Sequence, residues 1–524
     1  MTLDSLAPAL LVGAVIVLVA ILGVRFAGRL GVPGLLLYLG IGLVLGTVFE
    51  QLNFQDAELA AVLGYIALVL ILVQGGLTTR ISELRPVLWP AVALASVGVL
   101  ASIGLVAVPL IFFAGMSTSN AMLLAAVLAA TDAAAVFSVL RKLKLSPRLR
   151  TVLEGEAGFN DAPVVVLVSL IASGAFTDSP WWLIAFQIFA ELVGGAIVGV
   201  LGGMAARWIL PRLALPAVGL YPIAAMAMLV GTFALADFIH VSGFMAVYVG
   251  AVILGSAIRL PHRRSIIGFA DGLAWISEIG LFVMLGLLVN ISRLPQALGI
   301  AAVAGVTLVF FARPIAAFVS LTPFRWGLRE RLFVSVAGLR GAVPIVFAAI
   351  PLGLAVTGAE QVFDATVIVV IVLLLVQTPF LPMLAKRLGV ILPAEVAEFD
   401  LESAPLDAMD AVVLALDVPE GSGLIGVFIS ELGLPKGVVV SLIVRDNESF
   451  PIDSNSRLRA LDRVLVVCPG DARNATEARL RLVAKDGKLA TWIHPPEPVK
   501  RNHEKPSWPR VVANKAKLIF SRDQ

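Results

Sequence analysis

The sequence predicts an all-α membrane protein of about thirteen spans, with inverted repeats and broken helices at spans five and twelve, plus a small cytosolic α+β domain. The first observation is composition. The 524 residues are 59% hydrophobic and 14% charged, and the mean hydropathy is +0.97. So few charged residues cannot cover a soluble protein of this size. The second and third observations are the spacing of the apolar stretches and the alternation of basic residues between the loops.

The apolar stretches have the length that crosses a bilayer. A window of about 19 residues places them near residues 6–24, 32–49, 57–77, 87–113, 118–140, 151–174, 181–209, 215–237, 241–258, 267–290, 297–321, 330–356 and 361–384. The segment before the first stretch, Met1–Pro8, contains no Lys or Arg. We therefore expect the first stretch to be a retained span and not a cleaved signal peptide.

Basic residues occur in every second loop. They are Arg25, Arg29, Arg80, Arg85, Arg141, Lys142, Lys144, Arg148, Arg150, Arg207, Arg212, Arg259, Arg263, Arg264, Arg325, Arg329, Arg331, Lys386 and Arg387. The intervening loops contain only Arg293. Under the positive-inside rule, this pattern places the N-terminus outside and the C-terminal region in the cytoplasm, as expected for a bacterial-type plasma (inner) membrane. It also accounts for the net charge of +3, so we expect no nucleic-acid partner.

The hydrophobic pattern changes near residue 390. We expect a transmembrane domain at 1–390, a linker at 391–404, a cytosolic domain at 405–485 and a basic flexible tail at 486–524. The single cysteine, Cys468, lies in the cytosolic domain, so a disulfide within one chain is impossible.

The cytosolic domain shows β-rich runs and helical patterns in alternation. We expect strands at Ala411–Val418, Gly437–Arg445 and Arg463–Val467, and helices at Leu424–Leu434 and Asp471–Lys485.

Ionisable residues within the spans are the candidate functional residues, because each costs about 2.5–3.5 kcal/mol or more at the centre of a membrane. Three places stand out. They are Thr131 and Asp132 in span five, the group Glu154, Glu156, Asn160 and Asp161 in span six, and Arg340 in span twelve.

The polar residues of span six form a stripe on a regular helix. Glu156 and Asn160 are four residues apart, and Glu154 and Asp161 are seven apart. Asp161 is the deepest carboxylate. Burial disfavours its charged form and an approaching cation favours it, so a proton and a cation would compete for this group. The alternative is that the stripe is a fixed hydrogen-bonding network between helices.

Arg340 stays charged and needs a partner inside the bundle, for which Glu156 is the best candidate. The glycines around Arg340 and the nearby Pro344 predict a broken helix that lines a polar cavity. Thr131 and Asp132 interrupt an Ala-rich run in span five, seven spans earlier. Matching interruptions of this kind are expected of inverted repeats with an ion site between them.

Other charges within spans have two interpretations. Asp271 and Glu278 are seven residues apart in span ten, and Glu191 lies in span seven. Each could belong to a proton path or to a hydrogen bond between helices. An intramembrane enzyme is not expected, because neither H-E-x-x-H nor G-x-S-x-G is present. A ligand-gated potassium channel is the alternative function, but a filter of the T-V-G-Y-G type is also missing.

Together these motifs resemble the cation:proton antiporters of the electroneutral sodium/proton and potassium/proton branch, over nearly all of residues 1–390. The resemblance implies that Asp161 binds the cation and the proton, with Asn160, Thr131 and Asp132 also at the ion site. It implies that Glu156, paired with Arg340, steadies Asn160. It also implies a homodimer that works by alternating access, with no cofactor and no metal beyond the transported K⁺ or Na⁺.

Two positions depart from sodium-binding members of that family. Ala157 follows Glu156 where some members have Ser, and span three has Gln74 where they have an acidic residue. With fewer strong oxygen ligands, the site suits potassium better than sodium, because potassium loses its hydration shell more cheaply. We also regard Gln74, Glu154, Glu278 and Asp271 as further candidates for the ion path.

Residues 405–485 resemble the TrkA-C (RCK-C) module of potassium-transport regulators, through Gly421–Gly426, Glu431–Pro435 and Leu461–Val467. This second resemblance also favours potassium and implies regulation by a cytosolic ligand such as a nucleotide or cyclic dinucleotide. Gly421, Gly423 and Gly426 also match G-x-G-x-x-G. A dinucleotide fold is not expected, because the module is too small for a doubly wound sheet.

Overall fold

The computed structural model describes most of the chain. The described residues are 11, 13–23, 34–48, 56–132, 135–136, 143, 145–178, 180–257, 260–391, 401–406, 411–419, 421–445, 448–450, 452, 456–469 and 472–487. Contacts within the chain divide it into two compact units, Met1–Leu392 and Pro393–Gln524. Each unit is described by itself.

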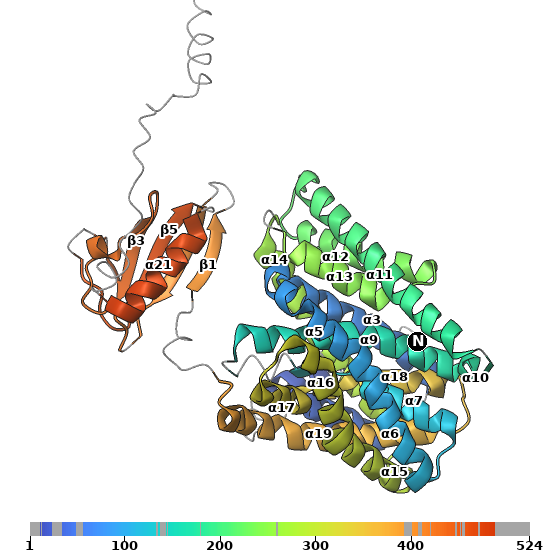
Figure 1. The fold of residues 1–524 in the computed structure, drawn as a ribbon. Coiled ribbons are helices and arrows are strands. Elements are labelled where there is room, and N and C mark those ends of the chain that lie inside the picture. Colours follow the sequence, from blue (N-terminus) through green and yellow to red (C-terminus); the bar gives the residue numbers. More distant parts are fainter. Residues whose placement is uncertain are drawn as a thin grey trace, which may run out of the picture. The chain divides into compact units, whose positions relative to one another are not determined.

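The first unit is helical (Figure 1). After an apolar helical segment at Gly13–Gly23, its labelled elements are α2 (Gly34–Val48), α3 (Ala57–Thr78), α4 (Ile81–Leu84), η2 (Arg85–Val87), α5 (Leu88–Ala93), η3 (Leu94–Gly98), α6 (Val99–Ala114), α7 (Thr118–Ala129), α9 (Pro147–Ala172), α10 (Ala175–Asp178), α11 (Trp181–Ile209), η4 (Leu210–Arg212), α12 (Leu220–Phe238), α13 (Gly243–Gly255), α14 (Arg263–Leu288), α15 (Leu294–Thr307), η5 (Leu308–Ala312), α16 (Arg313–Leu321), η6 (Thr322–Phe324), α17 (Leu328–Ala337), α18 (Ala342–Gly353) and α19 (Ala359–Leu388).

Eight helical stretches among the described residues are long and apolar enough to cross a membrane, and α17 with α18 forms a ninth if the bent pair is one span. Shorter apolar helices occur at Gly13–Gly23, Gly34–Thr47, Thr118–Ala129 and Gly243–Gly255. The expectation of a many-helix membrane protein is therefore confirmed. The count of thirteen stays a prediction.

The helices differ greatly in how many of their residues are buried. In the most apolar 18 residues of each stretch, 83% are buried in α9 and 17% in the stretch Trp181–Arg212, which contains α11. Figure 1 shows α9 running through the middle of the helical unit. The exposed residues of α11 include Trp181, Trp182 and Phe186, as expected of a helix that faces lipid. The polar stripe predicted for span six is thus carried by the central helix.

Two helical stretches contain a π-helical turn of five residues. One is η3 in the stretch Ile81–Ala114, and the other is η5 in the stretch Leu294–Phe324. Single π-turns inside α-helices often lie at functional sites. The two turns are packed reciprocally, since η3 contacts α16 and η5 contacts α6.

The second unit is a five-stranded antiparallel sheet in the order β1-β2-β5-β3-β4. Its elements are β1 (Leu401–Leu406), β2 (Ala411–Asp417), η7 (Ile429–Leu432), β3 (Val439–Arg445), β4 (Glu448–Phe450), β5 (Arg463–Pro469) and α21 (Arg473–Asp486). In Figure 1, α21 crosses the sheet, and its Leu480 and Val483 join the buried cluster that includes Leu414 and Val466.

The structure corrects two expectations for this unit. The predicted helix Leu424–Leu434 is wrong, because Gly426 and Gly433 have positive φ and leave only the short turn η7. The predicted linker 391–404 overlaps β1, whose register with β2 pairs Leu401 with Leu416. Residues 392–400 of the linker and 488–524 of the predicted tail lie outside the described residues.

Candidate functional site

The polar stripe lies on α9, a long helix with a capped N-terminus and mostly buried residues. The Ser146 side chain accepts a hydrogen bond from the Leu149 amide at 3.3 Å, and Pro147 occupies the first turn. Glu154, Glu156, Asn160 and Asp161 are all buried. Buried polar groups need partners, and the partners of these four differ.

Asn160 and Thr131 form a direct link between α9 and the end of α7. The Asn160 Nδ2 donates a hydrogen bond to Thr131 Oγ1 at 2.6 Å. Both residues are 1% exposed, as is Asp161. Asn160 Oδ1 and Asp161 Oδ1 have no hydrogen-bond partner among the described residues. Two buried oxygens on consecutive residues therefore remain available for a cation or a proton.

Asp132 joins the interrupted stretch after α7 to the interruption between α17 and α18. Its Oδ2 accepts a hydrogen bond from the Ala342 amide at 2.7 Å, and its own amide donates to the Leu339 carbonyl at 3.0 Å. The α17–α18 pair is bent by 48°. A carboxylate at the first residue of α18 complements the positive N-terminal end of that helix. A Cβ at Gly341 would overlap Asp132 Oδ2, so glycine is needed for this approach.

Arg340 lies at the same crossing, which is the place where the interruption after α7 meets the interruption between α17 and α18. Its positive charge offsets the negative charge at the C-terminal end of α7. Its Nε donates to the Leu128 carbonyl at 2.8 Å, and its Nη1 donates to the Gly338 carbonyl at 2.8 Å. Leu128 lies in the last turn of α7, where carbonyls point out of the helix. A cation there complements the negative helix end. Asp132 and Arg340 thus neutralise helix ends of opposite sign.

The predicted ion pair between Glu156 and Arg340 is wrong. Glu156 pairs with Arg313, the first residue of α16, through Nη1 to Oε1 at 2.5 Å and Nη2 to Oε2 at 3.4 Å. Arg313 Nη2 also donates to the Val334 carbonyl at 3.3 Å. A guanidinium can donate two parallel hydrogen bonds to one carboxylate, and Arg313 does so with Glu156. Arg340 instead donates to two backbone carbonyls.

Our interpretation of the sequence omitted Arg313, although the signal was present. It is an arginine inside the apolar stretch Leu294–Phe324, where a charge is as costly as at Arg340. A further sign is Gly338, where a Cβ would overlap the Arg313 guanidinium. This glycine, two residues before Arg340, therefore makes room for a different arginine.

Gln74 and Asp271, predicted separately as lesser candidates, are hydrogen bonded to each other. The Gln74 Nε2 on α3 donates to Asp271 Oδ1 on α14 at 2.6 Å. The carboxylate next to Gln74 is therefore supplied by α14. This contact agrees with the second interpretation given for Asp271, a hydrogen bond between helices.

The other lesser candidates lie apart from this pair. Glu154 accepts a hydrogen bond from Arg150 Nε at 2.7 Å, one turn earlier on α9. Glu278 is buried on α14, seven residues from Asp271, and lies close enough to Asp132 for their charges to interact. Asp132 and Glu278 thus extend the polar region from the crossing toward α14.

No cluster of three or more metal-ligating side chains occurs among the residues that the structure describes. The polar residues of the crossing instead offer isolated oxygens, Asp161 Oδ1 and Asn160 Oδ1. Such a site suits a weakly held monovalent ion better than a tightly bound transition metal.

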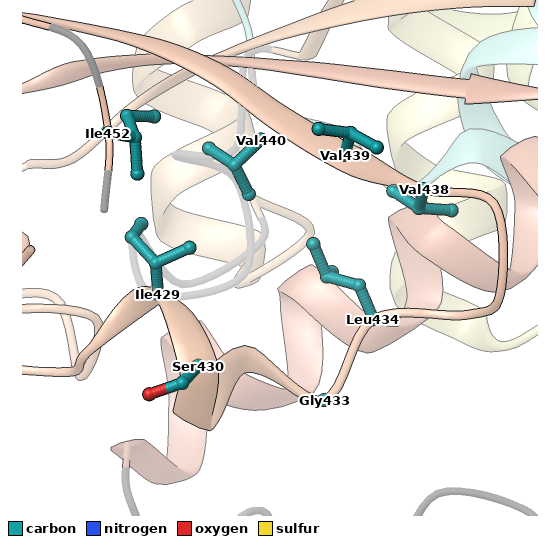
Figure 2. A pocket seen from close by; sticks show the side chains of 8 residues that line it. All are labelled: Ile429, Ser430, Gly433, Leu434, Val438, Val439, Val440 and Ile452. Carbon is teal, nitrogen blue, oxygen red and sulfur yellow. The ribbon is translucent and has the colours of Figure 1, made fainter. Parts of the chain in front are cut away.

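The sheet unit contains an apolar pocket between η7 and the edge of β3. Figure 2 shows its lining side chains, which are Ile429, Ser430, Gly433, Leu434, Val438, Val439, Val440 and Ile452. Ser430 provides the polar side chain of this lining. Phosphate groups prefer basic residues or free backbone amides, so the pocket itself offers little to a nucleotide. The ligand expected for this unit stays a prediction.

An ion pair with a buried carboxylate links the end of β3 to the residue before β5. Arg445 Nε and Nη2 donate to the two carboxylate oxygens of Asp462 at 2.7 and 2.8 Å. Burial raises the pKa of Asp462, but hydrogen bonds from Arg445 and from the Arg459 amide outweigh burial, so the pKa lies below its ordinary value. Asp462 therefore remains charged at neutral pH.

Comparisons with known proteins agree for both units. The family model "Sodium/hydrogen exchanger, transmembrane" matches residues 14–387, and the TrkA-C domain model matches residues 413–481. The K(+)/H(+) antiporter NhaP2 of Shewanella oneidensis is 33% identical over 479 residues, which are 89% of this chain and 82% of that protein. The K(+)/H(+) antiporter NhaP of Alkalimonas amylolytica is 33% identical over 473 residues, covering 88% of this chain and 81% of that protein.

Two other similar proteins carry sodium in their names. The Na(+)/H(+) antiporter NhaH of Halobacillus dabanensis is 29% identical over 298 residues, which are 53% of this chain and 71% of that protein. The structure of the sodium proton antiporter MjNhaP1 from Methanocaldococcus jannaschii matches with a TM-score of 0.62 at 23% identity, over 73% of this chain and 99% of that one. This last match shows a shared fold.

Proposed function

Because the chain belongs to the sodium/hydrogen exchanger family and carries a TrkA-C domain, we propose that it exchanges potassium for protons across a bacterial inner membrane. Its relatives in both the potassium and the sodium groups are antiporters by name. None of those names describes an enzyme or a channel. A cation/proton antiporter is therefore the function that both the family and the site support.

The observation that carries the proposal is the pair of free oxygens at Asp161 and Asn160. They lie side by side in the sequence of the most buried long helix, where Thr131 orients the Asn160 amide so that its oxygen stays free. Pro163 also has no N–H to donate to the Phe159 carbonyl, which leaves a third oxygen near Asp161. Asp161 supplies the charge, so a cation and a proton exclude each other there.

Alternating access needs a site that two arrangements of helices can each expose. The two interrupted stretches meet at Asp132, and the stretches with π-turns, predicted spans four and eleven, are also seven spans apart. This second matching pair supports the proposal of inverted repeats. The homodimer, the outer N-terminus and the control of transport by the TrkA-C domain stay predictions.

Potassium preference is the finer part of the proposal. Ala157 adds no hydroxyl ligand beside Glu156, and Gln74 has a neutral amide where some sodium-binding members have an acidic residue. Six of the relatives at 33% identity are named as K(+)/H(+) antiporters. A site with few strong ligands favours the ion that dehydrates more cheaply.

The test is cation-driven dissipation of a proton gradient in everted membrane vesicles that contain the full chain. Potassium should dissipate the gradient at lower concentration than sodium, and Asp161→Asn should abolish the response to both. Asp417→Asn is the matched control, because Asp417 lies in the sheet unit and pairs with Arg463 at the surface. Retained exchange in Asp161→Asn would refute the role of this residue. Preference for sodium would refute the choice of ion alone.

A further inference from the structure

Tyr248 is an aromatic residue of α13 that the function proposed above leaves unused. It is 1% exposed and lies inside an apolar helix. Its ring meets the ring of Phe159 edge to face, with centroids 5.1 Å apart and an interplanar angle of 83°. Tyr248 therefore packs against α9 at the residue that precedes Asn160.

Gly158 shows how closely the two helices approach. A Cβ at Gly158 would overlap the ring carbons Cζ and Cε2 of Tyr248 and lie 2.6 Å from its hydroxyl oxygen. The ring thus packs directly on the backbone of α9, in the space that a side chain at position 158 would occupy.

The contacted surface of α9 is the one that bears Asp161. Gly158 and Asp161 are three residues apart, so they share a face of the helix and are separated by about 4.5 Å along its axis. Glu154 lies four residues before Gly158 on the same side. The Tyr248 ring consequently lies over the α9 face between Glu154 and Asp161.

The ring is held from behind by tight packing of α13 on α3. A Cβ at Gly76 would lie 2.9 Å from the Tyr248 carbonyl oxygen and 2.6 Å from the Ala251 Cβ. A second close contact occurs one turn later, where Gly255 approaches the Leu77 backbone. The ring therefore belongs to a stiff α3–α13 pair, whereas Asp161 belongs to α9, which packs on α5, α7 and α18.

We propose that the Tyr248 ring is a seal on one side of the Asp161 site and keeps cation and proton movements coupled. Exchange requires that Asp161 is never open to both sides of the membrane at once. The ring closes one route in this conformation, and separation of α9 from the α3–α13 pair opens it. Replacing the ring with a methyl group leaves space beside polar groups, which water can enter. This inference rests on the proposed antiport, because it assigns a role in coupling at the same site.

The experiment compares purified full-length variants reconstituted into proteoliposomes, measuring both potassium-driven proton exchange and the passive proton leak without potassium. The variants are Tyr248→Phe, Tyr248→Leu, Tyr248→Ala, Gly158→Ala and the double variant Gly158→Ala/Tyr248→Ala. Phe363→Ala is the matched control, since Phe363 is a fully buried ring on α19. Monodispersity in detergent shows which variants are folded.

Tyr248→Phe should behave as the unaltered protein, because it keeps the ring. Tyr248→Ala should raise the passive proton leak several-fold and reduce coupled exchange. Tyr248→Leu should give a leak between those of Tyr248→Phe and Tyr248→Ala. If the alanine variant does not fold, the leucine variant is the test. Gly158→Ala should also leak, because its methyl group displaces the ring. The double variant should leak no more than Tyr248→Ala alone, since the methyl group then has room.

A normal leak and normal exchange in folded Tyr248→Ala or Tyr248→Leu would overturn the seal. An equal leak in Phe363→Ala would overturn it too, because general loosening would then explain the result. If the unaltered protein exchanges protons with neither potassium nor sodium, the proposed antiport fails; exchange with sodium alone refutes only the choice of ion, and both outcomes are distinct from failure of the seal.

Discussion

Removing the Arg313 side chain should strongly destabilise the helical unit, because it leaves the buried Glu156 carboxylate without its partner. The Glu156 and Arg313 side chains are only 3% and 6% exposed. Two charges about 4 Å apart interact by about 4 kcal/mol at an effective dielectric constant of about 20. Breaking such a pair strands a buried charge, which costs about 3–5 kcal/mol. We expect a loss of this size for Arg313→Ala.

The assay is a double-mutant cycle on the unfolding free energy in detergent. Glu156→Gln removes the stranded charge, so Arg313→Ala/Glu156→Gln should recover part of the loss. The matched cycle uses Arg340→Ala with the same Glu156→Gln, and there we expect little recovery because Arg340 binds the carbonyls of Leu128 and Gly338. Additive losses in the first cycle, or rescue in the second, would refute the pairing and restore the partner predicted from the sequence.

Three further changes test other contacts. Gly341→Ala should abolish exchange and lower the yield of folded protein, because its methyl group overlaps Asp132. The control is Gly305→Ala, where an added Cβ lies at ordinary contact distance. Normal exchange in Gly341→Ala would contradict the close approach of Asp132 to α18. Gln74→Glu replaces the hydrogen bond to Asp271 with a second carboxylate, and a cation between the two carboxylates would relieve their repulsion; we therefore expect better use of sodium relative to potassium in the vesicle assay, and an unchanged ratio would exclude this position from ion choice. The depressed pKa of Asp462 adds stability that is present at neutral pH and is lost as pH falls through the folded-state pKa, below the ordinary 3.8; Asp462→Asn should remove this acid dependence of unfolding of the sheet unit, and an unaltered pH profile would contradict it.

The fold was largely predictable because a bilayer imposes a strong constraint on sequence. Apolar stretches of spanning length must be helices, since no water is present to satisfy an exposed backbone. The sheet unit was harder to predict at its turns. The segment from Leu424 to Leu434 has the periodicity of a helix, yet Gly426 and Gly433 adopt positive φ and end the helical path.

The candidate site was predictable in its residues but not in all its pairings. The expense of burying Asp161, Asp132 and Arg340 marks them in the sequence. Nothing in the spacing tells which arginine reaches Glu156, because that depends on the approach of α16 to α9 and on the space left by Gly338. Likewise, Gln74 gives no sign that its partner is Asp271, 197 residues away.

The central claim is that a proton and potassium compete for Asp161, and the most direct measurement is the potassium dependence of exchange at a series of pH values in proteoliposomes. Competition for one carboxylate predicts that the half-saturating potassium concentration is constant at high pH and rises linearly with the proton concentration once protons occupy the carboxylate, while the maximal rate stays constant. A half-saturating concentration that does not change with pH would contradict the claim.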